Sequence, residues 1–307
     1  MNFPPNVKPE KSAYVQLLAL AGYALAGVFV FTALGFAILF LMYGSKVFEP
    51  NALTGGNPEY LNGLKIIQIC TSIGLFFAPP LLLAFENGRK IKDFYGFGKP
   101  KAEWIFLVFL IMICSMPFME WTALINQKMI LPDFLKPLDT WMREKEEEAM
   151  RMTLILLKIN TTWDFLVNLF MIALVPAVAE ELMFRGGVQR GLNRMFNNPH
   201  VAIWFAAFIF SAIHMQFFGF LPRLLLGAGF GYIYYWSGSL WYAMLGHFIN
   251  NGYAVCVAWY LQIKHLPLDD ADNTFHFKWY GYILSLLVTI ALFIYFKKRT
   301  THGKQLG

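Results

Sequence analysis

Charged residues are scarce in this 307-residue chain. The 25 lysines and arginines and 19 aspartates and glutamates make up 14% of the sequence, whereas 57% of the residues are hydrophobic and 18% are aromatic. An average soluble domain carries about 25% charged residues. So few charges cannot cover the surface of a soluble chain of this length, and the same composition disfavours disorder, collagen, a coiled coil and nucleic-acid binding. We therefore predict a multi-pass integral membrane protein whose surroundings are the lipid bilayer.

Cysteine is rare as well. Cys70, Cys114 and Cys256 are isolated from one another, and each lies in an apolar stretch. This distribution excludes a disulfide framework and a CxxC metal site. The first apolar run, at about 14–43, is roughly twice as long as the hydrophobic region of a signal peptide, and no clear cleavage site follows it. We expect this run to be a retained membrane helix.

Apolar runs of the length that spans a bilayer, about 20 residues, recur along the chain. They predict an all-α polytopic bundle of about eight transmembrane helices, forming a single integral membrane domain over residues 1–307. The division of 200–261 into three helices depends on turn signals at 219–222 and 237–239. The eight runs lie at 14–43, 64–85, 104–125, 165–184, 201–218, 222–236, 240–261 and 279–296.

The loop charges predict an orientation. Lysine and arginine gather in short loops on the cytoplasmic side of membrane proteins. Basic residues cluster at 89–101, 185–194 and 297–299, whereas Asp269, Asp270 and Asp272 precede the last run. We therefore predict that both termini are cytoplasmic, in the cell membrane if the source is bacterial. The long connection at 126–163 carries a charged stretch at 143–148, which favours a solvated helix face, with a role in admitting substrate as the alternative.

A few ionisable and amide side chains lie within the apolar runs. Each ionised group costs about 2.5–3.5 kcal/mol to insert at the bilayer centre, so each is a candidate functional residue. They form three groups at the ends or within the fourth, fifth and seventh runs. The groups are Glu180, Glu181 and Arg185; His214; and His247 with Asn250 and Asn251.

Helical geometry sorts the first group. Residues four apart share a helix face, so Glu181 and Arg185 can pair, whereas Glu180 points about 100° away and has no obvious local counter-ion. A carboxylate that acts as a proton acceptor needs such a position. Pro176 lies one turn upstream and leaves the Ile172 carbonyl without its usual backbone donor, so we predict a kink where the helix enters the site.

The other two groups supply imidazoles and amides. Phe210 and His214 fall on one face of their helix, and His247 shares a face with Asn250 and Asn251. Each of these polar groups alone is also a common interhelical hydrogen-bonding residue. Together, a carboxylate and an imidazole can hold and deprotonate a water molecule, directly or through a metal. A second imidazole and an amide can donate to the oxyanion that forms on a carbonyl, which predicts peptide hydrolysis.

The three groups also resemble the motifs of a known family. The pattern is similar to that of the CPBP intramembrane proteases, also called the Abi family, which include the type II CAAX prenyl endopeptidases and bacteriocin-processing or self-immunity proteins. The resemblance covers roughly 165–260, the predicted motif core. The motifs, in order and on separate predicted helices, are Glu180-Glu181-x-x-x-Arg185, Phe210-x-x-x-His214 and His247-x-x-x-Asn251.

This resemblance implies an eight-helix fold with a polar cavity that opens toward the cytoplasmic side, and cleavage of a membrane-associated peptide or protein near that face. It implies that Glu180 is the general base for water and that His214 helps to bind the water. His247 and Asn251 would stabilise the oxyanion, and the other two members of the first motif would support the geometry. The substrate would be a CAAX-type prenylated protein or a leader or bacteriocin-type peptide.

The sequence leaves two questions open: whether the site holds a metal, and whether the protein is an enzyme or a transporter or scaffold. Glu180, His214 and His247 would make a three-ligand zinc site with water in the fourth position, although no HExxH or HxxEH motif is present. A metal-independent glutamate mechanism is the other possibility. A proton-coupled transporter or a non-catalytic scaffold would use the same intramembrane polar residues. The sequence lacks the matching pair of Gly/Pro-broken helices that is typical of inverted-repeat transporters.

Overall fold

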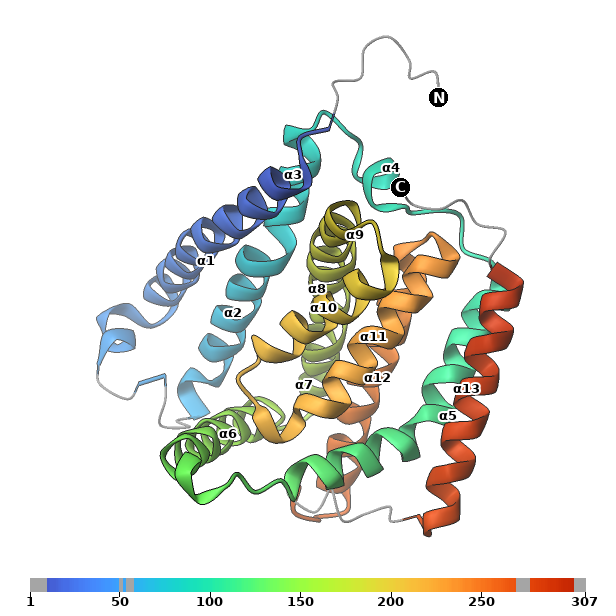
Figure 1. Cartoon of the computed structure of the whole chain (residues 1–307). Coiled ribbons are helices and arrows are strands. Elements are labelled where there is room, and N and C mark those ends of the chain that lie inside the picture. The colour runs from blue at the N-terminus through green and yellow to red at the C-terminus, as the bar shows by residue number, and fades with distance from the viewer. Residues whose placement is uncertain (1–9, 50–51, 54–57, 269–276, 301–307) are drawn as a thin grey trace.

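The computed structural model describes residues 10–49, 52–53, 58–268 and 277–300. Throughout these ranges the regular secondary structure is helical, which confirms the predicted all-α class (Figure 1). The acidic residues Asp269, Asp270 and Asp272, predicted on the outer side, lie outside the described residues.

All eight predicted runs form helices. Six helical segments of the described chain are long and apolar enough to cross a membrane. Of the other two, α10 has only 14 residues, about 21 Å of helix, and α12 has 24 residues but contains the polar motif residues. The predicted number of about eight spans is therefore approximate. The helices are α1 (Ala13–Tyr43), α2 (Leu61–Ser72) continuing into α3 (Ala78–Glu86), α5 (Ala102–Gln127), α7 (Thr162–Asn168) continuing into α8 (Val175–Glu181) and α9 (Arg190–Phe196), α10 (Pro199–Ala212), α11 (Phe220–Ser237), α12 (Leu240–Ile263) and α13 (Trp279–Thr300), with the shorter α4 (Ile91–Tyr95) and the connecting α6 (Lys136–Leu156).

The span from α7 to α9 is interrupted by two π-helical stretches, Leu169–Leu174 and Leu182–Gln189. A π turn bonds residue i to i+5 and often occurs at functional sites. The first stretch leads into Pro176, where the sequence predicts a kink, and the second follows Glu181 directly. The short α8 that carries the first two motif glutamates is thus bounded by a π turn on each side.

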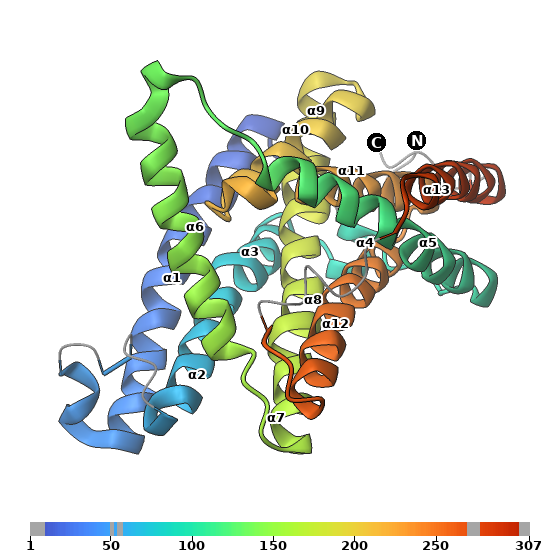
Figure 2. The ribbon, with the colours of Figure 1, turned by 90° about the horizontal axis from the view of Figure 1, so that it is seen from below.

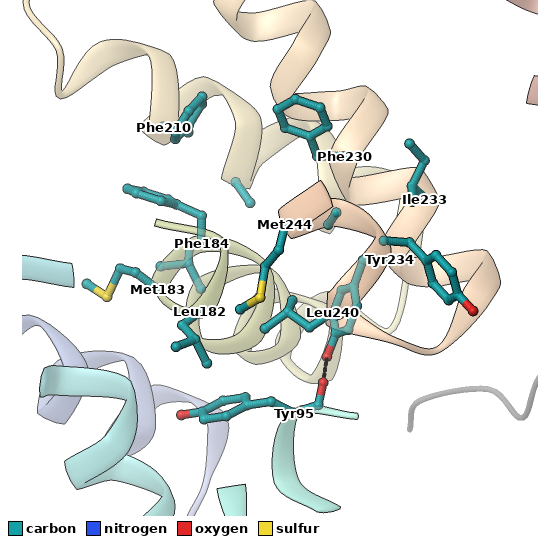
Figure 3. Close-up of a cluster of buried hydrophobic side chains, with 14 of the residues drawn as sticks. Tyr95, Leu182, Met183, Phe184, Phe210, Phe230, Ile233, Tyr234, Leu240 and Met244 are labelled. Atoms are coloured by element: carbon teal, nitrogen blue, oxygen red, sulfur yellow. Dashed lines mark hydrogen bonds between the residues drawn. The ribbon is translucent and has the colours of Figure 1, made fainter. Parts of the chain in front are cut away.

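The site helices lie in the middle of the bundle. Helices α10 and α11 pack along each other, and α12 packs against α5, α8 and α11 (Figures 1 and 2). On one flank α13 packs on α5, and on the other α1 packs on α2 and α3. A large apolar cluster fills the interior beside a smaller one at Ile203, Ala207 and Ala228, and within the large cluster the Tyr234 hydroxyl donates to the Tyr95 carbonyl at 2.8 Å (Figure 3).

The start of α1 and the end of α13 lie toward the same end of the bundle (Figure 1). Near these two segments Arg190 is paired with Glu10 at 2.7 Å and Arg299 with Glu103 at 2.6 Å. Helix α6 crosses the opposite end (Figure 1). The positive-inside rule places the basic end in the cytoplasm, and this orientation stays a prediction.

The charged stretch of α6 forms a solvated face, as predicted. Arg143 pairs with Asp139 at 2.8 Å and Lys145 with Glu148 at 2.7 Å, with most of these side chains exposed. Glu146 is an exception, because its Oε2 accepts a hydrogen bond from the Phe218 backbone N–H at 3.2 Å. Helix α6 is thereby tied to the turn between α10 and α11, which also follows His214.

Candidate active site

Two residues of the first motif and the histidine of the third meet in a buried hydrogen-bonded network. Oε1 of Glu181 accepts from Nη1 of Arg185 at 2.6 Å and from Nδ1 of His247 at 2.8 Å. The predicted i, i+4 pair is confirmed, and its side chains are only 2% (Arg185) and 0% (Glu181) exposed. A carboxylate oxygen can only accept, so Nδ1 of His247 carries the proton of this bond. Nε2 is therefore the ring nitrogen that His247 can use toward the site.

Aromatic rings hold this network in place. The Arg185 guanidinium lies 4.8 Å from the Phe210 ring centre and 5.4 Å from that of Phe230, and its Nη2 donates to the Gly227 carbonyl at 2.8 Å. The His247 ring stacks on Phe230 with an interplanar angle of 13°. Phe210 and Phe230 project from neighbouring helices α10 and α11 into the apolar cluster (Figure 3). Packed rings of this kind lock the rotamers of the charged groups beside them.

Glu180 differs from its neighbour in having no hydrogen bond among the described residues. Its Oε2 lies 3.9 Å from Nε2 of His247, which is too long for a hydrogen bond, and its side chain is 12% exposed. The lone pairs of Glu180 are thus available to a water molecule, whereas Oε1 of Glu181 already accepts two bonds. This arrangement agrees with the predicted divergence of the two adjacent carboxylates.

His214 was predicted within the fifth helical run, but it lies in the turn that follows α10, two residues beyond the last helical residue Ala212. Its Nδ1 donates to the Phe210 carbonyl at 2.8 Å, since a carbonyl oxygen can only accept. In the neutral ring this bond leaves Nε2 unprotonated. The Phe210 ring packs edge-on against both imidazoles, at 5.1 Å from His214 and 6.0 Å from His247. The second motif therefore joins the other two through one phenylalanine.

Asn251 bonds to the carbonyl that Pro176 leaves free. Its Nδ2 donates to the Ile172 carbonyl at 3.0 Å, and its Oδ1 accepts from Asn250 at 3.1 Å. The predicted loss of a backbone donor at Ile172 is thus compensated by a side chain from α12. This bond fixes α12 against the helix turn that leads into Glu180.

We expect replacement of Asn251 by leucine to lower stability by about 1–3 kcal/mol, because the Ile172 carbonyl then loses a donor in an apolar setting. In a Pro176→Ala background, a backbone N–H is again present at position 176, so the same replacement should cost less. Thermal unfolding of the four proteins in detergent measures this coupling. Equal costs in both backgrounds would show that Asn251 does not act through the Ile172 carbonyl.

The predicted zinc ligands do not converge. Within the described ranges, no group of three or more histidine, cysteine, aspartate or glutamate side chains is arranged to hold a metal ion. The hydrogen bonds of Nδ1 in His214 and in His247 leave Nε2 as the nitrogen that each ring could offer to a metal, and Glu180 lies 3.9 Å from Nε2 of His247. In the described residues Glu180, His214 and His247 are not grouped as a three-ligand site requires, and we derive no step through a metal.

Sequence reasoning missed Arg223, which lies in the first turn of α11. Its guanidinium lies over Gly219, where an added Cβ would come within 3.2 Å of Nη2, and it donates to Oε1 of Gln216 at 2.7 Å. Its charge is close enough to act on Glu180 and His214. The signal was present in the sequence, because Arg223 is an ionisable residue at the start of an apolar run.

Two apolar cavities adjoin the first turn of α11. The larger, of about 650 Å³, lies between α5, the end of α6 and α12, and its lining includes Pro222 and Asn250, the neighbour of Asn251. The smaller, of about 570 Å³, lies beside Met142 of α6 and is lined by Phe217 and Leu221. Both cavities lie between the site and the end of the bundle that α6 crosses.

One comparison with known proteins matches the part of the chain that carries the motifs. The family model described as type II CAAX prenyl endopeptidase Rce1-like matches residues 162–253. An uncharacterized protein of Bacillus subtilis (strain 168), YpbD, is 28% identical over 110 residues, which is 34% of this chain and 52% of that protein. The chain thus matches about half the length of this relative. No solved structure matches. The predicted resemblance is confirmed over residues 162–253, which include all six polar motif residues and match the model of the Rce1-like type II CAAX prenyl endopeptidases.

Proposed function

We propose that this protein is an intramembrane endopeptidase that hydrolyses a peptide bond of a membrane-associated substrate. The observation that carries the proposal is the Glu180 carboxylate, which makes no hydrogen bond to any described residue and lies beside the hydrogen-bonded imidazole of His247, in the region that matches the family model. A carboxylate with available lone pairs is suited to take a proton from water, whereas Glu181, whose Oε1 binds both Arg185 and His247, is suited to hold other groups.

In the proposed reaction, Glu180 removes one proton from a water molecule. The other hydrogen of this water is donated to Nε2 of His214. The resulting hydroxide attacks the substrate carbonyl, and Glu180 then passes the proton to the departing amine. The oxyanion is stabilised by Nε2–H of His247 in its protonated form, which Glu181 supports through Nδ1. Asn251 holds α12 against the turn before Glu180, so it contributes mainly through position.

The orientation bears on the substrate class. The basic residues and α6 lie at opposite ends of the bundle, and both cavities lie on the α6 side of the site. If the basic end is cytoplasmic, peptides would enter from the other side of the membrane. A prenylated cytoplasmic protein would require the reverse orientation or a different route. Cytoplasmic termini and cleavage near the cytoplasmic face therefore stay two separate proposals.

Hydrolysis in ¹⁸O-labelled water tests the proposed function. Purified protein in liposomes is incubated with apolar membrane peptides, and products are analysed by mass spectrometry. We expect two fragments, with one labelled oxygen in the new carboxyl group, because the attacking oxygen comes from water. Intact peptides together with proton-coupled uptake that requires Glu180 would instead support the transporter alternative.

A further inference from the structure

Arg223 is a cation whose described partners are neutral. The hydrogen bonds of its guanidinium go to the Oε1 of Gln216 at 2.7 Å and to the Gln216 carbonyl at 3.4 Å. Glu146 and Glu180 act on it through their charge and not through a hydrogen bond. Gln216 thus holds the guanidinium over Gly219 without neutralising it. A cation kept in an apolar bundle without a bonded anion is costly, so a functional partner is expected.

The position of Arg223 relates it to both the cavities and the reacting groups. Pro222, its neighbour in sequence, lines the larger cavity, and Leu221 lines the smaller one. The charge of Arg223 also reaches Glu180 and His214. A peptide with its scissile bond at Glu180 would therefore lie within reach of the charge of the Arg223 guanidinium.

We propose that Arg223 binds a carboxylate of the substrate close to the scissile bond, so that the preferred substrate is an apolar peptide with a nearby acidic group. The inference rests on the proposed function. A planar guanidinium recognises a carboxylate with two parallel hydrogen bonds, and Arg223 is already fixed on its Gln216 side. The carboxylate is either the C-terminus of the peptide or an acidic side chain.

Electrostatics predict the sign of the selectivity. A substrate carboxylate that approaches the site meets Glu180 and, on the α6 side, Glu146, and both repel it. Arg223 offsets this repulsion in the wild-type protein. Without Arg223 the remaining acids should disfavour an acidic peptide, so the preference should disappear or reverse, a change that loss of a merely structural residue would not produce.

Matched peptides test the proposal. One pair differs only in a C-terminal carboxylate or carboxamide, and the other pair only in an internal Glu or Gln beside the scissile bond, which separates the two sources of the carboxylate. For the pair that varies the carboxylate that Arg223 recognises, we expect wild-type kcat/KM to favour the acidic peptide about 10- to 100-fold. Arg223→Gln should bring this ratio to about one or below, mainly through KM, with the neutral peptide changed less than about threefold. Arg223→Lys should restore part of it.

The control is Arg299→Gln, which removes an arginine that pairs with Glu103 at the basic end, far from the site. This variant should keep the wild-type ratio. The proposal is overturned if wild type does not distinguish the peptides of either pair, or if Arg223→Gln slows acid and neutral peptides equally. Equal slowing would instead indicate that Arg223 acts on the reacting groups or on folding.

A binding measurement separates this proposal from the proposed function. Fluorescent versions of the same peptides are titrated onto Glu180→Gln and onto Glu180→Gln/Arg223→Gln in liposomes. We expect the first variant to bind the acid more tightly and the double variant to lose that difference. Absence of cleavage by wild type would reject the endopeptidase function, while the binding ratio still decides whether Arg223 recognises a carboxylate.

Discussion

Replacement of Glu180 by glutamine is expected to lower kcat for peptide hydrolysis by about 10²- to 10⁴-fold, the range contributed by a general base. The amide has the same shape as the carboxylate but cannot take a proton from water. Because Glu180 makes no hydrogen bond among the described residues and is 12% exposed, its replacement should leave the melting temperature nearly unchanged. Cleavage rates and thermal unfolding of the same preparation measure both effects.

The matched control for Glu180 is Glu103→Gln, which removes a carboxylate that pairs with Arg299 at the basic end of the bundle. It should cleave at the wild-type rate. A Glu180→Gln/His214→Ala variant should be little slower than the slower single variant, because residues that act on one water are not additive. Cleavage by Glu180→Gln at more than a tenth of the wild-type rate would remove Glu180 from the role of base.

Much of the fold follows from the sequence because the bilayer sets the length of an apolar helix. Each of the eight predicted runs contains a helix. Pro176 lies in the first turn of α8, and the turn residues at 237–239 separate α11 from α12. Composition could not show which helices are complete spans. Helix α10 is only 14 residues long. The π turns on both sides of α8 depend on tertiary packing, and the local sequence does not predict them.

The site was predictable to the extent that its geometry is local. The pairing of Glu181 with Arg185 follows from helical spacing alone, and so does the different direction of Glu180. The bond from His247 to Glu181 joins residues 66 apart in sequence, so it depends on how α8 and α12 pack. Arg223 could have been noticed as an ionisable residue at the start of an apolar run. Its hydrogen bond to Gln216 and its nearness to the cavity at Pro222 depend on the tertiary structure.

The second large effect is expected on stability, from the buried pair of Glu181 and Arg185. Replacing Arg185 by methionine leaves Glu181 buried without its cation, and Oε2 of Glu181 already has no hydrogen-bond partner in the structure. Breaking one side of a buried pair costs about 3–5 kcal/mol. We expect a correspondingly large fall in the free energy of unfolding, measured by denaturant titration in micelles. Arg143→Met, which breaks an exposed pair of the same spacing with Asp139, should have little effect.

The double variant Glu181→Leu/Arg185→Met separates folding from chemistry. Removing both charges leaves no unpaired ion, so much of the stability lost in Arg185→Met should return. Activity should not return with it, because His247 then lacks the carboxylate that holds its Nδ1 proton and directs Nε2 to the site. If the double variant were both stable and fully active, Glu181 would have no part in orienting His247. If it stayed as unstable as the single variant, the cost would lie in packing against Phe210 and Phe230 and not in the unpaired charge.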